Sequence, residues 1–334
     1  MNQSLDTIAH KLLAFLRVQR QDPALAYAVY PTPIQGGYET QVYRFQLSDT
    51  GYGDGRRLAH PLLLRLYPAR FGAGNAVRES IVQTVLAAHG YLVPRVHSLC
   101  TDLSILGGAF FIMDFLPGAP LALAPPATVP ALLGATQATL HRIDPAPLAA
   151  ALTTHGQDIR HFQFDSRLAD LQHRSAALPW LHGAVAWLIE QRPPAPPQLA
   201  VCHGDFHPFN VLAQDGVVTA VLDWPGFLIA DPVQDLAATM VLMTIPVKQI
   251  GPTVGLDLSA TGLAAFVQHY LAAYQAAQPL DLTHLDYYQV VRCVSALVEG
   301  VEGHTLWQPP TVVVDLIDRI QTLTGIPLQR VQPY

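Results

Sequence analysis

The chain has 334 residues, of which half are apolar and 13% are charged. That composition supplies a large hydrophobic core and excludes an intrinsically disordered chain, which combines low hydrophobicity with high charge. A net charge of −6 disfavours a nucleic-acid partner, because binding to a phosphate backbone requires a basic surface. The three scattered cysteines form neither a disulfide framework nor a CxxC motif, which favours a reducing compartment.

The N-terminal segment is predicted to be a helix over residues 4–19. Its apolar residues recur at helical spacing with charges between them, which is not the pattern of a signal peptide. The longest apolar stretch, Leu236 to Val247, is interrupted by threonines and is shorter than the roughly 20 residues of a membrane span. We therefore expect a core helix there and a cytoplasmic protein that makes no contact with membranes.

The first 115 residues are predicted to be rich in strands. Residues 22–33 are predicted to be a connector, and a loop rich in Gly and Asp separates the first two strands. Asn75–His89 has the spacing of a helix. The predicted strands are Gln41–Leu47, Pro61–Leu66, Pro94–Leu99 and Ala109–Phe115.

Residues 116–334 are predicted to be mainly helical, because apolar side chains recur there every three or four positions. The predicted helices are Val129–Arg142, Leu178–Gln191, Val233–Thr244, Gly262–Ala276, Leu285–Glu302 and Val312–Leu323. A strand-rich region followed by a helical region predicts two lobes with a ligand site between them.

The densest group of polar side chains lies in the stretch CHGDFHPFNVLAQDGVVTAVLDWPGFLIADPVQDLA, which begins at Cys202. Asp215-Gly216 is a favoured signal for a tight turn, so residues 211–213 and 217–222 are predicted to form a hairpin. That hairpin would return Asp223 to Asn210. The candidate chemical groups of the stretch are His203, Asp205, His207, Asn210 and Asp223.

Phosphoryl transfer needs the oxygen donors that this stretch supplies. The Mg²⁺ ion that accompanies a nucleoside triphosphate prefers carboxylate and amide oxygens, and a separate carboxylate must orient the attacking hydroxyl. The spacing Asp205-x4-Asn210 equals that of the protein-kinase catalytic loop. Asp223 then stands where the metal-binding aspartate follows the hairpin.

The motifs HGDFHPFNV, VLDW and DPVQDLA together resemble the aminoglycoside phosphotransferase family, relatives of the protein kinases that phosphorylate small molecules. The resemblance implies an α+β, bilobal, protein-kinase-like fold. Its small antiparallel-sheet N-lobe would comprise residues 1–115, and its larger, mainly helical C-lobe residues 116–334 with the catalytic loop at 203–210.

By this resemblance, Asp205 is the catalytic base, and Asn210 and Asp223 bind Mg²⁺. The supporting residues that the resemblance implies are His203, His207, Asp231 and Asp235. A zinc-dependent hydrolase built on Cys202, His203 and His207 is an alternative, but Pro208 argues against the helix that an HxxxH zinc motif requires. An accidental cluster of polar residues is the other alternative.

The N-lobe is expected to bind the nucleotide. Gly36 and Gly37 would allow close approach of the backbone to phosphate oxygens, although the pair equally suits a plain β-turn. Arg65 lies within an apolar predicted strand, where a buried charge requires a partner, and Glu79 on the following helix is the candidate. An ordinary ion pair at a strand edge is the alternative reading.

Arg65 departs from the protein-kinase pattern, which has lysine at that strand position. Arginine keeps the charge but differs in size and hydrogen-bonding geometry. A catalytically inactive kinase-like protein that binds a nucleotide or ligand is therefore kept as an alternative function. The resemblance implies main-chain contacts to adenine in an interlobe hinge formed by Met113, Asp114, Phe115 and Leu116.

The sequence indicates the identity of the acceptor less clearly than any other feature of the site. Tyr288, Glu299 and Glu302 are candidate acceptor contacts, and the two glutamates, three residues apart, could trap an ammonium group or form a solvated face. The predicted function is transfer of the γ-phosphoryl group of ATP, with GTP left open, to a hydroxyl of an aminoglycoside-like or amino-alcohol small molecule. The predicted cofactor ion is Mg²⁺.

Overall fold

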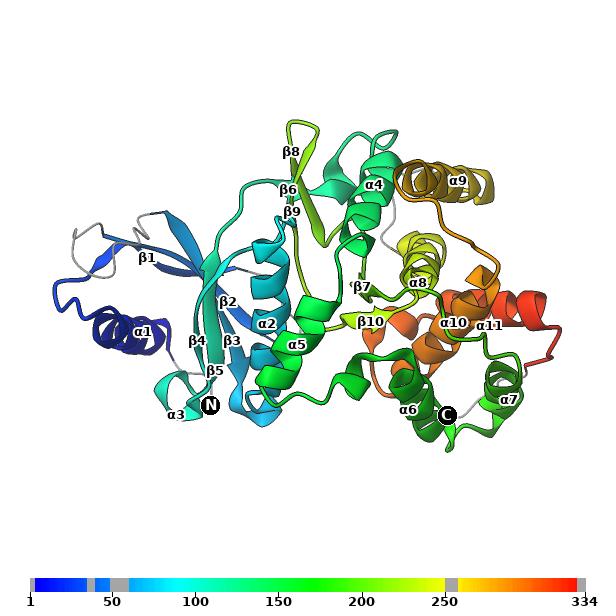
Figure 1. Ribbon diagram of the computed structural model, residues 1–334, viewed down its shortest axis with the longest axis horizontal. Helices are drawn as coiled ribbons and strands as arrows, with labels where there is room; N and C mark the ends of the chain where they lie inside the picture. Colours follow the sequence, from blue (N-terminus) through cyan, green and yellow to red (C-terminus); the bar gives the residue numbers. More distant parts are fainter. Residues whose placement is uncertain (1–3, 35–39, 49–59, 250–257, 329–334) are drawn as a thin grey trace. The chain divides into compact units, whose positions relative to one another are not determined.

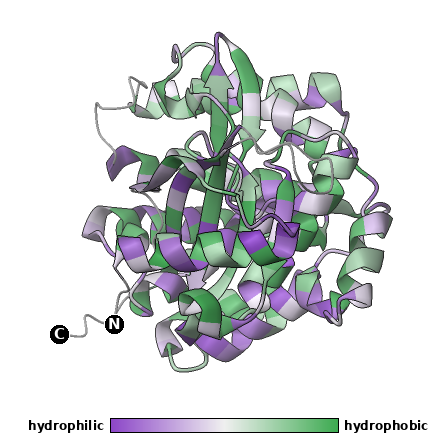
Figure 2. Ribbon diagram, turned by 90° about the vertical axis from the view of Figure 1, so that its left-hand side faces the viewer, coloured by the Kyte–Doolittle hydropathy of each residue, from purple (hydrophilic) through white to green (hydrophobic). Residues whose placement is uncertain are grey.

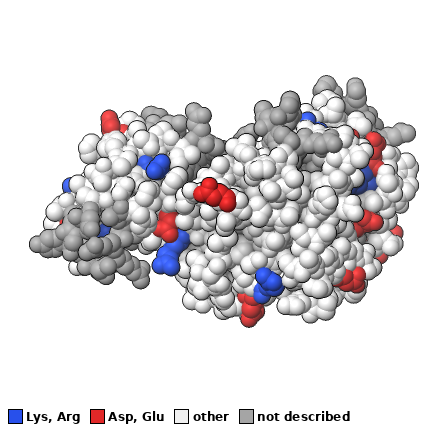
Figure 3. Space-filling model, turned by 90° about the horizontal axis from the view of Figure 1, so that it is seen from above, with Lys and Arg blue, Asp and Glu red and all other residues white. Residues whose placement is uncertain are grey.

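The computed structural model describes residues 4–34, 40–48, 60–249 and 258–328. The chain divides into two compact units, of which the first comprises residues 1–117 and 220–225 and the second residues 118–219 and 226–334. Within the described ranges, no helix combines the length and the hydropathy needed to cross a bilayer. Charged side chains are few and scattered on the face shown in Figure 3.

The first unit is built on a five-stranded antiparallel sheet with the order β1-β2-β3-β5-β4 (Figure 1). Its strands are β1 (Tyr27–Ile34), β2 (Gln41–Leu47), β3 (Pro61–Pro68), β4 (Val96–Cys100) and β5 (Gly108–Asp114). Its helices are α1 (Leu5–Arg20), α2 (Gly74–Ala88) and the short α3 (Leu103–Leu106).

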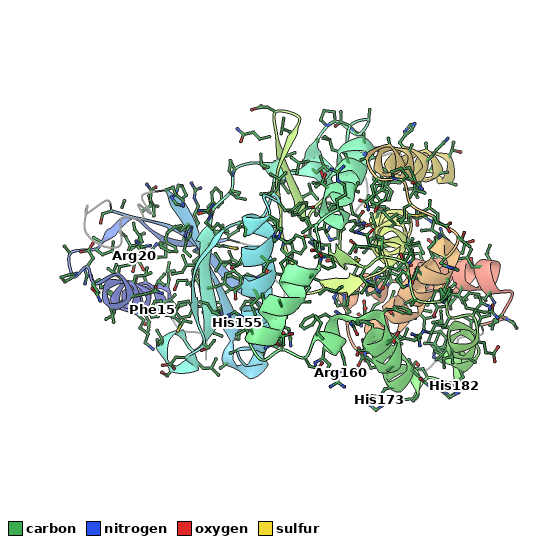
Figure 4. The ribbon with its side chains drawn as sticks, viewed as in Figure 1. Phe15, Arg20, His155, Arg160, His173 and His182 are labelled. Carbon is green, nitrogen blue, oxygen red and sulfur yellow. The ribbon has the colours of Figure 1, made fainter. Side chains whose placement is uncertain are left out.

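Helices α1 and α2 lie on opposite faces of this sheet (Figure 1). Side chains alternate along β3, so that Leu62 and Leu64 pack in the core beneath α1, where Phe15 of α1 (labelled in Figure 4) also lies 5.1 Å from the ring of Phe110. Arg65 and Tyr67 belong to the opposite face, which α2 covers. Figure 2 shows hydrophobic colours along most of the strands.

The prediction that residues 22–33 form a connector is wrong, because Tyr27–Ile34 forms the edge strand β1. Pro31 and Pro33 interrupt the usual strand pattern, but an edge strand tolerates proline because one side of it has no neighbour to receive an N–H. The other strands and the helix predicted in this region form close to their expected bounds.

The second unit is mainly helical. Its helices are α4 (Val129–His141), α5 (Ala146–Thr154), α6 (Phe164–Ser175), α7 (His182–Glu190), α8 (Pro232–Thr244), α9 (Ala260–Ala277), α10 (Leu285–Val301) and α11 (Pro310–Thr324). Its short strands are β6 (Ala119–Pro120), β7 (Ala200–Cys202), β8 (Val211–Gln214) and β10 (Leu228–Ala230), and β9 (Val217–Val221) starts in this unit and ends in the first.

The core of the second unit forms where α6, α7, α8, α10 and α11 pack together. Helix α8 is buried on nearly all sides, as expected of the apolar stretch that begins at Leu236. The structure also contains α5 and α6, two helices that were not predicted from the sequence. Leu168 and Leu171 are the buried apolar residues of a largely polar α6. Two apolar positions are too few to give a strong helical period in the sequence.

Candidate functional site

The loop that follows β7 is held by the carboxylate of Asp235 in the first turn of α8. The backbone N–H of His203 donates to Oδ2 of Asp235 at 2.9 Å, and that of Gly204 donates to Oδ1 at 2.7 Å. Burial alone would raise the pKa of Asp235, but its hydrogen bonds and the nearby histidines lower it to about 2. Asp235 therefore remains an ionised acceptor that fixes the start of the loop.

Helix α4 supplies the other partners of Asp235. Nε2 of Gln137 donates to Oδ2 of Asp235 at 2.9 Å, and Nε2 of His141 lies 3.0 Å from the same oxygen. The second nitrogen of His141, Nδ1, lies 2.8 Å from the hydroxyl of Tyr274 in α9. Because Gln137 and His141 are four residues apart, they share one face of α4 and join three helices to the loop.

Gly204 makes a sharp turn at the beginning of the loop. Its φ of +81° lies in the left-handed region that favours glycine. A Cβ atom added there would lie 2.2 Å from the carbonyl oxygen of Gly226, so the two segments approach too closely for a larger residue. This turn directs the chain from the buried His203 to Asp205.

Asp205 and Asn210 lie together in the loop. Nδ2 of Asn210 donates to the backbone oxygen of Asp205 at 3.0 Å and to its Oδ2 at 3.3 Å. The amide nitrogen of Asn210 thereby binds the backbone and the carboxylate of Asp205. The side chain of Asp205 is 44% exposed, so a ligand can reach its carboxylate.

Positive charge and a histidine hydrogen bond keep Asp205 ionised. Desolvation alone would raise the pKa of Asp205, but the hydrogen bond with His207 and the charges of His207, His203 and Arg292 bring it to about 2. Arg292 belongs to α10 and is also paired with Glu299, at 3.2 Å. An anionic oxygen is therefore present on Asp205 throughout the physiological pH range.

The two histidines of the motif serve the loop. The backbone N–H of Asp205 donates to Nδ1 of His203 at 3.2 Å, and that of Phe209 donates to Nδ1 of His207 at 3.3 Å. Nε2 of His207 lies 3.5 Å from Oδ2 of Asp205 and 3.2 Å from Nδ2 of Asn210. Cys202 instead directs its sulfur to the carbonyl oxygens of the β7–β10 pair.

Among the described residues, Cys202, His203 and His207 do not form a cluster of metal ligands. The structure therefore gives no support to the zinc-hydrolase alternative.

Asp231 caps α8. Its Oδ1 accepts a hydrogen bond from the backbone N–H of Val233 at 2.9 Å, which satisfies one of the free donors at the helix start. The hydroxyl of Tyr288, a predicted acceptor contact, donates to Oδ2 of Asp231 at 3.2 Å and is buried. The structure thus places Tyr288 in the support of α8.

Arg65 in the first unit contacts two carboxylates. Its Nη2 donates to Oδ1 of Asp223 at 2.6 Å, and its Nε lies 3.3 Å from Oε2 of Glu79 in α2. Nε also donates to the hydroxyl of Tyr67 at 3.1 Å, and this hydroxyl in turn donates to Glu79. The predicted pairing of Arg65 with Glu79 is present, and Asp223 is a second partner.

Glu79 is completely buried. Burial raises its pKa to about 7, which the charge of Arg65 and a hydrogen bond from the backbone N–H of Trp224 partly oppose. Gln83 donates a further hydrogen bond to Oε1 at 3.1 Å. Glu79 therefore changes its protonation near neutral pH, whereas Asp205 does not.

Asp223 follows β9 and has a φ of +68°, a conformation that aspartate tolerates better than most residues. The neighbouring Trp224 is buried, and its indole N–H donates to the backbone oxygen of Val221 at 3.1 Å. The backbone N–H of Val221 donates to the oxygen of Leu92 at 2.6 Å. These contacts fix the segment that carries Asp223 onto the first unit.

The predicted hinge begins at the end of β5. The backbone N–H groups of Asp114 and Phe115 donate to the oxygens of Arg95 and Pro61, each at 3.0 Å. An adenine ring would therefore have to use other main-chain groups of the segment from Met113 to Leu116. The predicted phosphate-binding residues Gly36 and Gly37 lie outside the described residues.

Each glutamate of the predicted ammonium trap has an arginine partner. Glu299 pairs with Arg292, and Glu302 forms a two-pronged pair with Arg174 in α6, with Nε 2.9 Å from Oε1. The guanidinium of Arg292 also lies over the ring of Trp307, at 4.6 Å. The structure does not bring the two carboxylates to one point.

Comparison with known proteins decides the family. Residues 31–280 match the model of the phosphotransferase enzyme family. The chain belongs to this family. The match confirms the resemblance seen in the sequence and the enzyme class of small-molecule kinases predicted from it.

Known structures of similar fold include other phosphotransferases. The macrolide 2'-phosphotransferase MphH from Brachybacterium faecium is 18% identical, with a TM-score of 0.55 over 95% of this chain and 99% of that chain. A thermostable mutant of aminoglycoside phosphotransferase APH(4)-Ia, in ternary complex with ADP and hygromycin B, is 15% identical, with a TM-score of 0.56 over 94% and 97%. These similarities confirm the predicted fold class.

Curated relatives include larger proteins. Acyl-CoA dehydrogenase family member 11 of Gallus gallus is 31% identical over 172 residues, which are 48% of this chain. The chain spans only 22% of the length of that protein.

Two residues that contact the candidate site residues were not predicted from the sequence. Tyr67 could have been found, because it lies two positions after Arg65 and so on the same face of β3. Gln137 could have been found as a polar residue four positions before His141 in an apolar helix. No local pattern indicates that Arg65 also contacts Asp223.

Proposed function

We propose that this phosphotransferase moves the γ-phosphoryl group of ATP, or of GTP, to a hydroxyl of a small molecule. The observation that supports this most directly is the pair formed by Asp205 and Asn210. It combines an accessible, ionised carboxylate with a carboxamide whose nitrogen is bound to the same loop. Such a pair is the part of a kinase site that acts on the acceptor and on the metal.

Asp205 would accept a hydrogen bond from the acceptor hydroxyl and so aim its oxygen at the phosphorus. A carboxylate with a pKa of about 2 is a weak base, so it would take the proton only late, when the new O–P bond is nearly complete. His207 and the backbone contacts of His203 would keep the loop in position during this transfer.

Asn210 and Asp223 would hold Mg²⁺. The donor types fit, because Mg²⁺ prefers carboxylate and amide oxygens, and the hydrogen bonds of Nδ2 leave Oδ1 of Asn210 as the coordinating atom. When bound, Mg²⁺ neutralises negative charge on the phosphate oxygens during transfer.

Arg65 would bind a phosphate group of the nucleotide from its position beside Glu79. The two-pronged guanidinium suits phosphate oxygens, and the buried carboxylate of Glu79 holds it. By the same proposal, the adenine would contact Met113, Asp114, Phe115 and Leu116. The phosphates would contact Gly36 and Gly37.

The acceptor is proposed to be a hydroxylated small molecule of the aminoglycoside or amino-alcohol class. The APH(4)-Ia complex with hygromycin B supports this class by analogy of fold. Recognition of an amine by Glu299 or Glu302 would require Arg292 or Arg174 to give up its partner. Glu299 and Glu302 are therefore weaker candidates for contact with the acceptor than the residues of loop 203–210.

A screen for acceptor-dependent ADP release tests this function. The panel should contain aminoglycosides, macrolides, homoserine, choline and fructosamines, each with ATP or GTP and Mg²⁺. Turnover with at least one acceptor is expected. Tight nucleotide binding without turnover on any acceptor would instead favour a catalytically inactive, kinase-like binding protein.

A further inference from the structure

Three side chains meet at one end of the sheet in the first unit. His60 immediately precedes β3, His97 lies in β4 and Asp114 ends β5. Nε2 of His60 lies 2.7 Å from Oδ1 of Asp114, and Nε2 of His97 lies 2.5 Å from the same oxygen. The Nε2 atoms of two imidazoles therefore point at one carboxylate oxygen.

The backbone explains this convergence. The pairing of β4 with β5 shifts between Val96 and Ser98, which face the consecutive residues Met113 and Ile112. His97 is therefore the extra residue of a β-bulge, a feature that often redirects a side chain. Hydrogen bonds from the N–H groups of Asp114 and Phe115 join the end of β5 to the adjacent segments.

The three groups have the chemistry of a transition-metal site. Two imidazoles and one carboxylate are a common set of protein ligands for zinc, with an open position for water. All three ligand atoms lie within 4.8 Å of one another. Mg²⁺ prefers an all-oxygen environment, so the imidazole pair selects a different class of ion from that proposed at Asn210 and Asp223.

The cluster can admit an ion with a small local adjustment. Ligand atoms around a tetrahedral zinc are separated by roughly 3.3–3.5 Å, given bonds of about 2.0–2.1 Å. The 2.5 and 2.7 Å separations must therefore widen by less than about 1 Å. The side chain of His60 is 44% exposed, against 11% for His97 and 22% for Asp114, so His60 is the ligand that can rotate.

We propose that His60, His97 and Asp114 form a binding site for a zinc-class divalent ion, with the remaining coordination position open to solvent. This inference does not depend on the proposed phosphotransferase reaction. In the absence of the ion, Asp114 accepts hydrogen bonds from both imidazoles, which explains why the ligands stay together.

Isothermal titration of the tag-free, full-length protein with ZnCl2, in buffer containing Mg²⁺, tests the site. One zinc ion per chain is expected. His60→Ala, which alters an exposed side chain and should fold normally, and Asp114→Asn are each expected to weaken zinc binding about 10-fold or more, because loss even of an outer partner typically weakens it that much. Melting temperatures measured without metal verify that the variants fold.

His89→Ala is the matched control. His89 is an exposed histidine of the same unit whose Nδ1 lies 2.8 Å from the backbone oxygen of Val85, and its loss should leave zinc binding unchanged. Replacement of zinc by Co²⁺ should give intense visible absorption bands in wild type and lose them in His60→Ala. Absence of zinc binding, or equal binding by wild type and His60→Ala, would overturn the proposal.

Discussion

Nη2 of Arg65 lies 2.6 Å from Oδ1 of Asp223, although 158 positions separate the two residues in the chain. The proposed phosphate-binding cation and a proposed Mg²⁺ ligand thus neutralise each other. A nucleotide bound with its metal ion would take over part of this ion pair. Glu79, the other partner of Arg65, would then keep the guanidinium in place.

Replacement of Arg65 should weaken both nucleotide binding and stability. Arg65→Met is expected to reduce nucleotide affinity roughly 10- to 100-fold, since it removes a charged hydrogen-bond donor. It should also lower the free energy of unfolding by about 3 kcal/mol at pH 8, because a buried carboxylate loses its partner. Arg65→Lys should lie between wild type and Arg65→Met in both measurements.

Arg160→Met is the control for Arg65. Arg160 (labelled in Figure 4) pairs with Asp158 on the surface of the second unit and is 78% exposed. Nucleotide titration and urea unfolding should show no change for this variant. Equal effects of the two arginine variants would contradict the role given to Arg65.

The stability of the first unit should depend on pH through Glu79. Its pKa is raised from 4.5 to about 7 in the folded state, so folding takes up a proton between these values. The resulting stabilisation is complete below pH 4.5 and is lost as the pH rises through 7, by up to about 3 kcal/mol. Glu79→Gln should remove this dependence.

Urea unfolding of wild type and Glu79→Gln at pH 5 and at pH 8 checks this prediction. The free energy of unfolding of wild type, minus that of Glu79→Gln, should be smaller at pH 8 than at pH 5. If this difference in the free energy of unfolding is the same at pH 5 and at pH 8, Glu79 does not titrate in this range.

Loss of the Asp235 carboxylate should destabilise loop 203–210. Asp235→Ala leaves the N–H groups of His203 and Gly204, and the side chains of Gln137 and His141, without their acceptor. A decrease of about 3–5 kcal/mol in the free energy of unfolding is expected, together with loss of turnover. Asp170→Asn, at an exposed position, should leave both unchanged, and a mild effect of Asp235→Ala would argue against this network.

A pair of glycine substitutions separates steric contact from backbone conformation. Gly204 and Gly156 both have positive φ, but a Cβ atom would meet the oxygen of Gly226 at Gly204 and nothing within 4 Å at Gly156. Gly156→Ala should be destabilised by about 1 kcal/mol from backbone strain, and Gly204→Ala by clearly more. Equal melting temperatures of the two variants would refute the close approach.

Most of the fold could be predicted because its elements carry strong local signals. The apolar period of α10 and the apolar run of β3 mark them clearly in the sequence. Strand β1 was missed because Pro31 and Pro33 hide it, and within the described part of the sheet it pairs with β2 alone. Helix α6 has few buried residues and therefore a weak period.

The contacts within loop 203–210 could be predicted because its residues lie close together in the chain. The pairing of Arg65 with Glu79 followed from the need of a buried charge for a partner. The contact of Arg65 with Asp223 and the cluster at Asp114 depend on long-range pairing and on a β-bulge. Neither leaves a local pattern, so only the structure shows them.

The role of Asp205 is tested by transfer of a radiolabelled γ-phosphoryl group from ATP to the best acceptor, measured for wild type and for Asp205→Asn. Wild type should transfer the group, and the variant should do so roughly 10²- to 10⁴-fold more slowly, the range typical of a lost proton-transfer group. Nucleotide affinity should be unchanged. Equal transfer rates for the two proteins would contradict the role of Asp205 and with it the proposed reaction.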